Sequence, residues 1–210
     1  MQPSPIPALS PGADPPSPTA GPPPVADRLA ARLHFDAAAG RIDDGPRRYL
    51  LMRPDVLMGM FARLAPPERE RASEAIAASI AEHGADSLRA YAARLGTIDD
   101  RLLQATAEAA ADLGWGRWRL EVDGGGLVLE VAGSPFAEGA GRSEAPVCAP
   151  VRGMLGALAA LRLGRPMRAR ELACRACGAE CCRFVAEPLD LPPDVPLDAA
   201  SVAAGSARER

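Results

Sequence analysis

The sequence predicts an α/β (α+β) domain in which an antiparallel sheet packs against helices. Of its 210 residues, 48% are hydrophobic, which is enough for a core of ordinary size. Stretches of helical period fill the middle of the chain, and an alternating apolar pattern around a glycine-rich turn follows them. We therefore expect one domain at 26–188, between a proline-rich disordered tail at 1–25 and a second disordered tail at 189–210.

Composition narrows the possible functions. All 24 basic residues are arginine, which excludes chemistry that depends on lysine, such as Schiff-base formation. The formal net charge of −3 does not suit direct binding of nucleic acid. No window approaches about 18 uninterrupted apolar residues, so we expect no membrane span. The first residues lack the basic segment and the following apolar segment of a secretory signal peptide. We therefore expect the protein to be in the cytoplasm, where thiols stay reduced.

The first elements are expected to be short strands followed by a helix. Two strands are predicted at 33–36 and 40–42 around a turn, and a third at 47–53, where an aromatic and aliphatic run stops at Pro54. Pro54 is a helix-start signal, and apolar residues then recur at helical spacing as far as Leu64. A strand is thus expected to lead directly into an amphipathic helix.

The middle of the chain is predicted to be helical. One helix begins at the Pro66-Pro67 pair and is expected to end at Gly84, and a second is expected at 87–95. Thr97, with Asp100 three residues later, resembles a capping box that starts a third helix.

Strands return in the last part of the domain. Alternating residues at 117–122 and 127–131 flank an Asp-Gly turn, which is the pattern of a β-hairpin. An apolar helix is expected at 146–163, and two final strands at 167–174 and 182–187 are expected to pair.

The cysteines are concentrated near the last two strands. Cys174, Cys177, Cys181 and Cys182 stand within nine residues, and Cys148 precedes the apolar helix. Such density without secretory features is typical of a metal or redox site. Neighbouring strand residues point to opposite faces, so Cys181 and Cys182 are not expected to share one ion. The alternatives are buried structural thiols, a cluster of Cys174, Cys177 and Cys181, and an Fe–S cluster.

Several motifs resemble the 4-vinyl reductase domain family. The resemblance covers residues 134–187 most specifically, in the runs Pro146-Val-Cys148, Arg152-Gly153-Met-Leu-Gly156, Glu171-Leu-Ala-Cys174 and Cys182-Arg-Phe184. The family includes a bacteriochlorophyll-synthesis protein and the sensor domains of phenol- and xylene-responsive activators. The resemblance implies the ligand-binding fold that nitric-oxide-signalling and Golgi-transport proteins share.

The resemblance also implies one structural zinc. In the sensor members three cysteines and a glutamate hold the metal, and by motif these roles fall on Cys148, Cys174, Cys182 and Glu138. Glu144 is the substitute for Glu138. Cys177 and Cys181 are additions to the family pattern and are expected to be incidental thiols.

A ligand is expected beside the zinc. The candidate lining residues are mostly apolar side chains of the 146–163 helix and its surroundings, namely Val151, Met154, Leu155, Leu158, Trp118 and Phe136. The helix stripe among them is also what a core requires, and one edge can serve both purposes. Gly153 and Gly156 would let this helix approach another backbone or a ligand closely.

Three functions follow from these expectations. The first is a stand-alone domain that binds a small hydrophobic or aromatic ligand in a sensory or carrier role. The second, implied by the family name, is an accessory or reductase factor in bacteriochlorophyll or other tetrapyrrole metabolism, although no dinucleotide fingerprint for a hydride source is present. The third is a homodimeric protein-interaction module.

Overall fold

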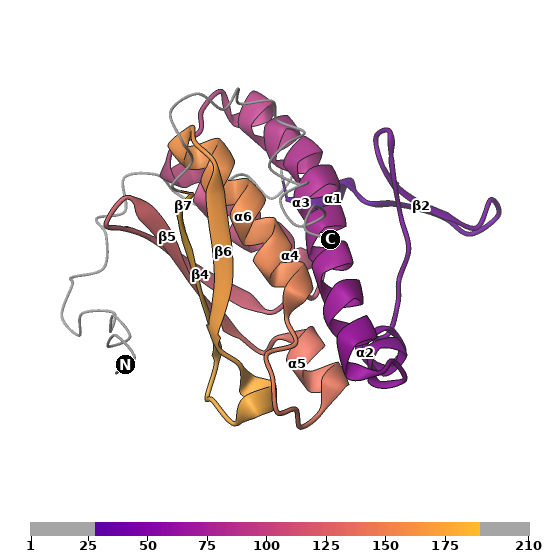
Figure 1. Ribbon diagram of the computed structural model, residues 1–210. Helices are drawn as coiled ribbons and strands as arrows, with labels where there is room; N and C mark the ends of the chain where they lie inside the picture. The colour runs from indigo at the N-terminus through magenta and orange to yellow at the C-terminus, as the bar shows by residue number, and fades with distance from the viewer. Residues whose placement is uncertain (1–27, 190–210) are drawn as a thin grey trace, which may run out of the picture.

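A computed structural model describes residues 28–189 of the chain. It has a four-stranded antiparallel sheet with helices packed on it and, to one side of this body, a three-stranded sheet formed by the first three strands of the described chain (Figure 1). Mixed helix and antiparallel sheet is the predicted fold class, which is confirmed. The expected tails at 1–25 and 189–210 lie outside the described residues, apart from Leu189. No helix in the described range is long and apolar enough to cross a membrane.

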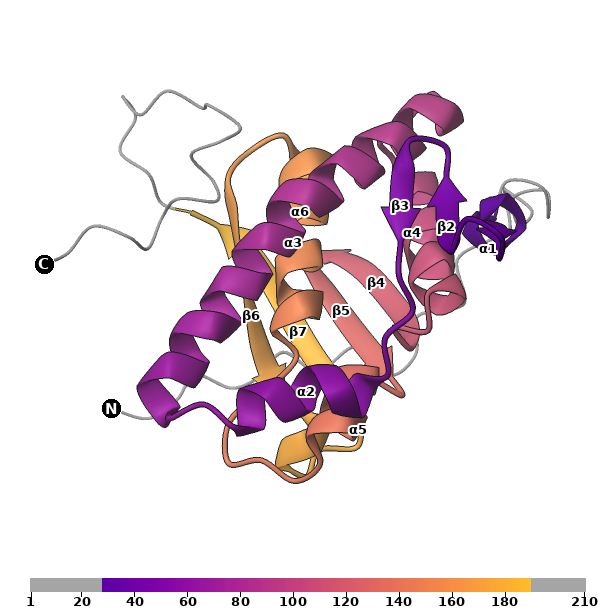
Figure 2. The ribbon, with the colours of Figure 1, turned by 90° about the vertical axis from the view of Figure 1, so that its right-hand side faces the viewer.

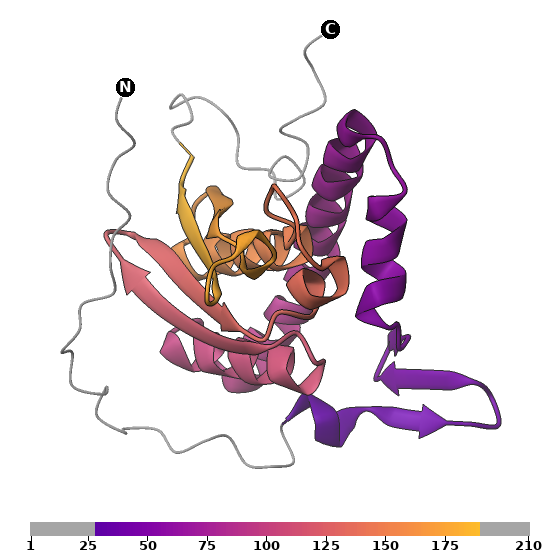
Figure 3. The ribbon, with the colours of Figure 1, turned by 90° about the horizontal axis from the view of Figure 1, so that it is seen from below.

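The small sheet is built from the first elements of the chain. Helix α1 (Leu29–Arg32) precedes the strands β1 (His34–Asp36), β2 (Arg41–Asp44) and β3 (Arg47–Tyr49), which pair in the order β1-β2-β3. The predicted strand at 47–53 ends at Tyr49, and Leu50 to Arg53 continue without strand structure and with exposed side chains. The small sheet projects away from the main body (Figure 3).

Two helices follow, and the second is longer than expected. Helix α2 (Pro54–Ala62) starts at the predicted proline, and α3 (Pro66–Leu95) is one helix of 30 residues. The predicted end at Gly84 is wrong. Gly84 lies inside α3, and a Cβ at this position would lie 2.8 Å from Cε of Met154. The missing side chain therefore lets the helix that carries Met154 pack closely against α3.

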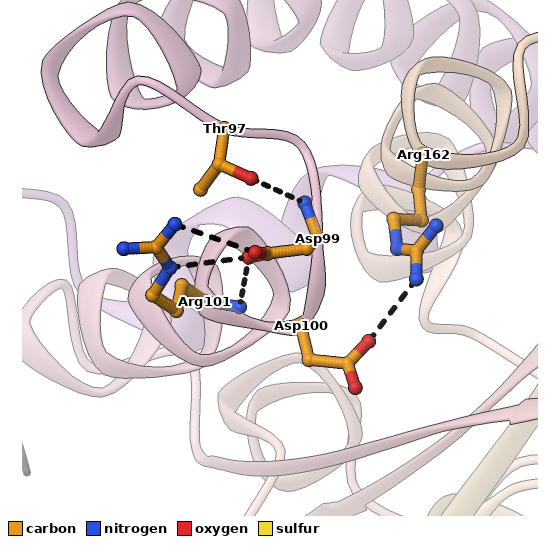
Figure 4. A network of polar contacts seen from close by, with 5 residues as sticks. All are labelled: Thr97, Asp99, Asp100, Arg101 and Arg162. Atoms are coloured by element: carbon orange, nitrogen blue, oxygen red, sulfur yellow. Dashed lines mark hydrogen bonds and ion pairs between the residues drawn. The ribbon is translucent and has the colours of Figure 1, made fainter. Parts of the chain in front are cut away.

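Helix α4 (Asp100–Asp112) has a different cap from the predicted one. Asp99 is the N-cap, and its Oδ1 accepts from the backbone N–H of Arg101 at 2.9 Å. Thr97 instead accepts from the N–H of Asp99 through its Oγ1, at 3.3 Å (Figure 4). Arg162 donates to Asp100 from the end of another helix, which ties the two helices together.

The main sheet has the order β4-β5-β7-β6 and is antiparallel throughout. Its strands are β4 (Arg117–Asp123), β5 (Gly126–Ala132), β6 (Met167–Ala173) and β7 (Cys182–Pro188), and both predicted hairpins are confirmed. Alternate residues of β5 and β7 enter the core, so Leu129 faces inward opposite Phe184.

Helix α6 (Ala149–Leu163) lies on this sheet and packs against α3 on its other side (Figure 2). The short helix α5 (Pro135–Ala140) occupies a segment that was expected to be loop, and it packs against α2. Ser134 caps α5 through its side chain, with Pro135 in the first turn, so the sequence did carry a helix-start signal there.

Candidate metal centre and pocket

Three thiols and one carboxylate meet at the end of the main sheet. The ligand atoms of Cys148, Glu171, Cys174 and Cys182 all lie within 4.8 Å of one another. The Sγ of Cys148 is 3.7 Å from that of Cys182 and 4.0 Å from that of Cys174. All three cysteines are buried and free of disulfide bonds. We call these four residues the thiol cluster.

The thiol cluster joins three parts of the chain. Cys148 is the N-cap of α6, Cys174 lies between β6 and the short 3₁₀ helix η2 (Arg175–Cys177), and Cys182 is the first residue of β7. Glu171 stands on β6, where the pairing with β7 shifts register between Glu171 and Ala173. In a regular strand Glu171 and Cys174 would point to opposite faces. The irregularity allows both to reach one site.

Polar contacts around the cluster fix its members. The N–H of Cys148 donates to Oε2 of Glu171 at 2.9 Å, and the N–H of Arg175 donates to Sγ of Cys182 at 3.3 Å. The Oγ of Ser134 lies 3.3 Å from Sγ of Cys148. The other oxygen of Glu171, Oε1, is buried and has no hydrogen-bond partner among residues 28–189. A buried acceptor without a donor is costly, and a bound cation would satisfy it.

Electrostatics also favour a cation in the cluster. Burial, followed by the neighbouring Cys174, raises the pKa of Glu171 to about 8. Contacts with Cys174 and Cys182, followed by burial, raise the pKa of Cys148, whereas contacts with Cys148 and Cys182 lower the pKa of Cys174. The cluster by itself thus favours one thiolate and keeps protons on its other members. A metal ion that displaces those protons fits the donor set.

The remaining predicted site residues lie elsewhere. Glu138 is exposed on α5 and Glu144 is exposed in the loop before α6, so the structure brings neither into the thiol cluster. Glu171 supplies the carboxylate. Cys177 is exposed and Cys181 is partly exposed, and both lie outside the cluster, as expected for additional thiols.

A pocket of about 500 Å³ lies between α3 and α4. Residues of β3, Trp115, Trp118 and Met154 of α6 complete its wall. The rings of Trp115 and Trp118 lie 6.4 Å apart, and Phe136 meets Trp115 edge to face at 5.1 Å. No member of the thiol cluster lines the pocket. Cys148 and Met154 are six residues apart in the sequence, about 9 Å along α6.

Two of the expected ligand-lining residues, Trp118 and Met154, line this pocket. Phe136 stands behind the wall, against Trp115. The helix stripe Val151, Leu155 and Leu158 is fully buried in the core and does not reach the pocket. These three residues therefore belong to the core, which was the other role expected from their helical spacing.

Residues 127–188 match the family model of the 4-vinyl reductase domain, and this segment holds all four members of the thiol cluster. The expected resemblance to that family is confirmed over this segment. No curated protein matches the chain.

Similarity to solved structures covers more of the chain than the family match does. The chain is 24% identical to the phenol-responsive sensory domain of the transcription activator PoxR, solved with phenol, with a TM-score of 0.66. The match covers 79% of this chain and 89% of that one. A vinyl-4-reductase family protein from Methanocaldococcus jannaschii is 12% identical over 68% of this chain and 98% of that one, with a TM-score of 0.38. A trafficking protein particle complex subunit 3 from Naegleria fowleri, covalently bound to palmitic acid, is 9% identical over 65% and 95%, with a TM-score of 0.44.

Proposed function

We propose that the chain is a sensory or carrier domain that binds a small hydrophobic or aromatic ligand in the pocket between α3 and α4. The observation that carries the proposal is an open pocket of about 500 Å³ with two tryptophans in its wall. Ligand pockets usually have this size and combine apolar walls with a few polar groups. The shared fold with a phenol-responsive sensory domain supports the same function.

We also propose that the thiol cluster holds one structural zinc ion, with Cys148, Glu171, Cys174 and Cys182 as its ligands. Thiolates favour soft or borderline cations, and four ligands complete the tetrahedral set that zinc prefers. Fe–S clusters usually require four thiolates, and this cluster has three. Because four protein ligands leave no position for water, the ion would connect α6 to the β6–β7 hairpin without taking part in a reaction.

Filling the pocket is expected to abolish ligand binding. Ser87 is half-buried on α3 and lines the pocket, so Ser87→Phe would occupy space that the ligand needs. With phenol as the probe, we expect saturable quenching of tryptophan emission in the wild type and a dissociation constant raised at least about tenfold in Ser87→Phe. The chain has two tryptophans and both line the pocket, so their emission reports on it directly.

The control is Ala93→Phe, which places the same ring on an exposed position of α3 outside the pocket. It should bind phenol like the wild type. Equal weakening in both variants, or binding that survives Ser87→Phe, would place the ligand elsewhere.

We further propose that the chain forms a homodimer through an exposed apolar surface. This surface consists of Leu50, Leu51, Met52, Val56 and Met60, between β3 and the outer face of α2. Leu51 is 80% exposed and Leu50 is 71% exposed, which is unusual for neighbouring leucines in a monomer. A two-fold axis would place this surface against its own copy, which gives a closed dimer.

Charging this surface should dissociate the dimer. In Leu51→Glu a carboxylate would have to enter an apolar contact, so the dimer dissociation constant should rise at least about tenfold. Sedimentation equilibrium over a range of concentrations measures it. Val122→Glu, at an exposed apolar position of β4, is the matched control and should leave the dimer intact. A wild-type protein that sediments as a monomer would exclude the proposal.

A further inference from the structure

The turn that follows Cys174 carries a further thiol. Cys174 is the N-cap of η2 and Cys177 is its last residue, and the N–H of Cys177 donates to the carbonyl oxygen of Cys174 at 3.0 Å. A turn of this kind keeps its first and fourth Cα atoms within about 7 Å of each other. A disulfide spans about 4.4–6.8 Å between Cα atoms, so these two cysteines can be bridged with little movement of the backbone.

Further hydrogen bonds hold the turn in place. The N–H of Ala179 also donates to the carbonyl oxygen of Cys174, at 3.2 Å, and the N–H of Ser143 donates to that of Ala176 at 2.9 Å. Ala176 is buried, so the turn is packed against the loop that precedes α6. The backbone geometry that a bridge requires is therefore already present in the folded, reduced protein.

The thiols of this region differ in their access to solvent. Cys148, Cys174 and Cys182 are at most 2% exposed, whereas Cys177 is exposed. Cys181 is partly exposed, but it lies outside the turn. The sulfur atoms of Cys148 and Cys182 are only 3.7 Å apart, yet both are buried. Because exposed thiols are oxidised before buried ones, an oxidant in solution reaches Cys177 first.

The side chains of Cys174 and Cys177 are also neighbours. Burial, followed by the charge of Cys174 and a hydrogen bond with it, raises the pKa of the Cys177 thiol. Cys177 therefore stays protonated at neutral pH, and its oxidation requires an excess of oxidant. Cys174 stands between the exposed thiol on one side and the buried thiol cluster on the other.

We propose that Cys177 is an oxidation site through which a hydroperoxide opens the thiol cluster, by way of a disulfide between Cys177 and Cys174. With hydrogen peroxide, one oxygen atom is transferred to Sγ of Cys177, which gives a sulfenic acid and one water. The thiolate sulfur of Cys174 then attacks this Sγ, the S–O bond breaks, and the leaving hydroxide takes up a proton to give a second water. The two sulfurs lose two electrons in total, and the peroxide gains them.

The disulfide removes one ligand from the thiol cluster. Its effect on a metal rests on the proposed zinc site, because Cys174 is one of the four residues proposed to hold the ion. Metal binding requires deprotonated ligands, and a bridged Cys174 no longer offers a thiolate. Since the cluster joins α6 to β6 and β7, loss of the ion would loosen the start of α6. A thiol reductant would restore both cysteines.

Peptide mapping of the full chain tests for the bridge directly. Trypsin cleaves after arginine, which places Cys174 in the peptide 171–175 and Cys177 in the peptide 176–183. After treatment with excess hydrogen peroxide and blocking of free thiols, mass spectrometry should find these two peptides joined in the wild type. They should stay separate in Cys177→Ala. Cys181→Ala, which changes another thiol of the same peptide, is the matched control and should keep the link.

Zinc release supplies a second measurement. Peroxide should release about one zinc per chain from the wild type, detected with the chromogenic chelator 4-(2-pyridylazo)resorcinol. Release should be at least about tenfold slower in Cys177→Ala and unchanged in Cys181→Ala. Reduction with dithiothreitol should restore zinc binding to the wild type.

The outcomes separate this inference from the proposed function. Equal rates of zinc release from Cys177→Ala and the wild type, or a map in which Cys177 is joined to Cys181, would overturn the inference and leave the zinc site intact. A wild-type protein purified without zinc would contradict the proposed site, and the peptide map alone would then decide whether Cys174 and Cys177 form the bridge. Separate peptides from the oxidised wild type would overturn the inference in either case.

Discussion

Replacing Cys174 with alanine is expected to remove the metal and to lower the free energy of unfolding by about 4 kcal/mol. Cys174 contributes one of three thiols to the thiol cluster, and a structural metal binds only the folded arrangement of its ligands. The metal dissociation constant should rise more than about 100-fold. Elemental analysis of the purified protein gives the metal and its stoichiometry, and denaturant unfolding with and without a chelator gives the stability.

The sequence offers a close control. Cys177 is three residues away, at the end of η2, and its exposed thiol lies outside the cluster. Cys177→Ala should retain one zinc per chain and the wild-type stability. A wild-type protein without metal would exclude the site, and so would a Cys174→Ala protein that keeps its full metal content.

The same measurement distinguishes the two candidate carboxylates. Glu171→Gln removes the charge from a cluster member and should weaken zinc binding, whereas Glu138→Gln changes an exposed side chain of α5 and should not. The family resemblance led to Glu138 because the run Ser134-Pro-Phe-Ala-Glu138 is similar to a Ser-x-x-Ala-Glu stretch that the family has before the cysteine of the helix start. Strand alternation would place Glu171 and Cys174 on opposite faces, but the register shift at the end of β6 and the turn into η2, where Cys174 lies, bring them to one site. That shift follows from the packed sheet and has no signal in the local period.

The sequence predicted which helices and strands are present better than it predicted the residues at which they begin and end. The hairpins of the main sheet and the helix α6 follow from apolar period and turn residues, which act over a few neighbours. Gly84 resembled a helix end, but it lies inside α3, at a point where Met154 of α6 leaves little room for a Cβ. Asp99 and Thr97 are both good capping residues, and local sequence alone does not choose between them.

The pocket was the hardest feature to predict. Trp118 and Met154 were expected in its wall, but Tyr49, Ser87 and Thr106 were not. These three come from β3, α3 and α4, which meet only in the folded chain. A pattern along one element reports which face is apolar, and it does not report which element covers that face.

Gly153→Ala is expected to lower the free energy of unfolding by about 3 kcal/mol, although alanine is the better helix former. Gly153 lies on α6 where that helix touches the backbone of α3. A Cβ at this position would lie 2.2 Å from the carbonyl oxygen of Ala77, and a main-chain atom inside a long helix cannot move aside easily. The two helices must separate to admit one methyl group. That shift would also disturb Cys148 at the start of α6.

Gly156→Ala, on the same helix, is the matched control with the opposite expected sign. A Cβ there would make an ordinary contact of 3.8 Å with the side chain of Ala169. The helix propensity of alanine should then raise the free energy of unfolding by about 0.5–1 kcal/mol. Denaturant unfolding of the two variants therefore distinguishes close backbone packing from a general effect of alanine in α6. If both substitutions shift stability in the same direction, the α3–α6 contact at Gly153 is not the constraint that the structure indicates.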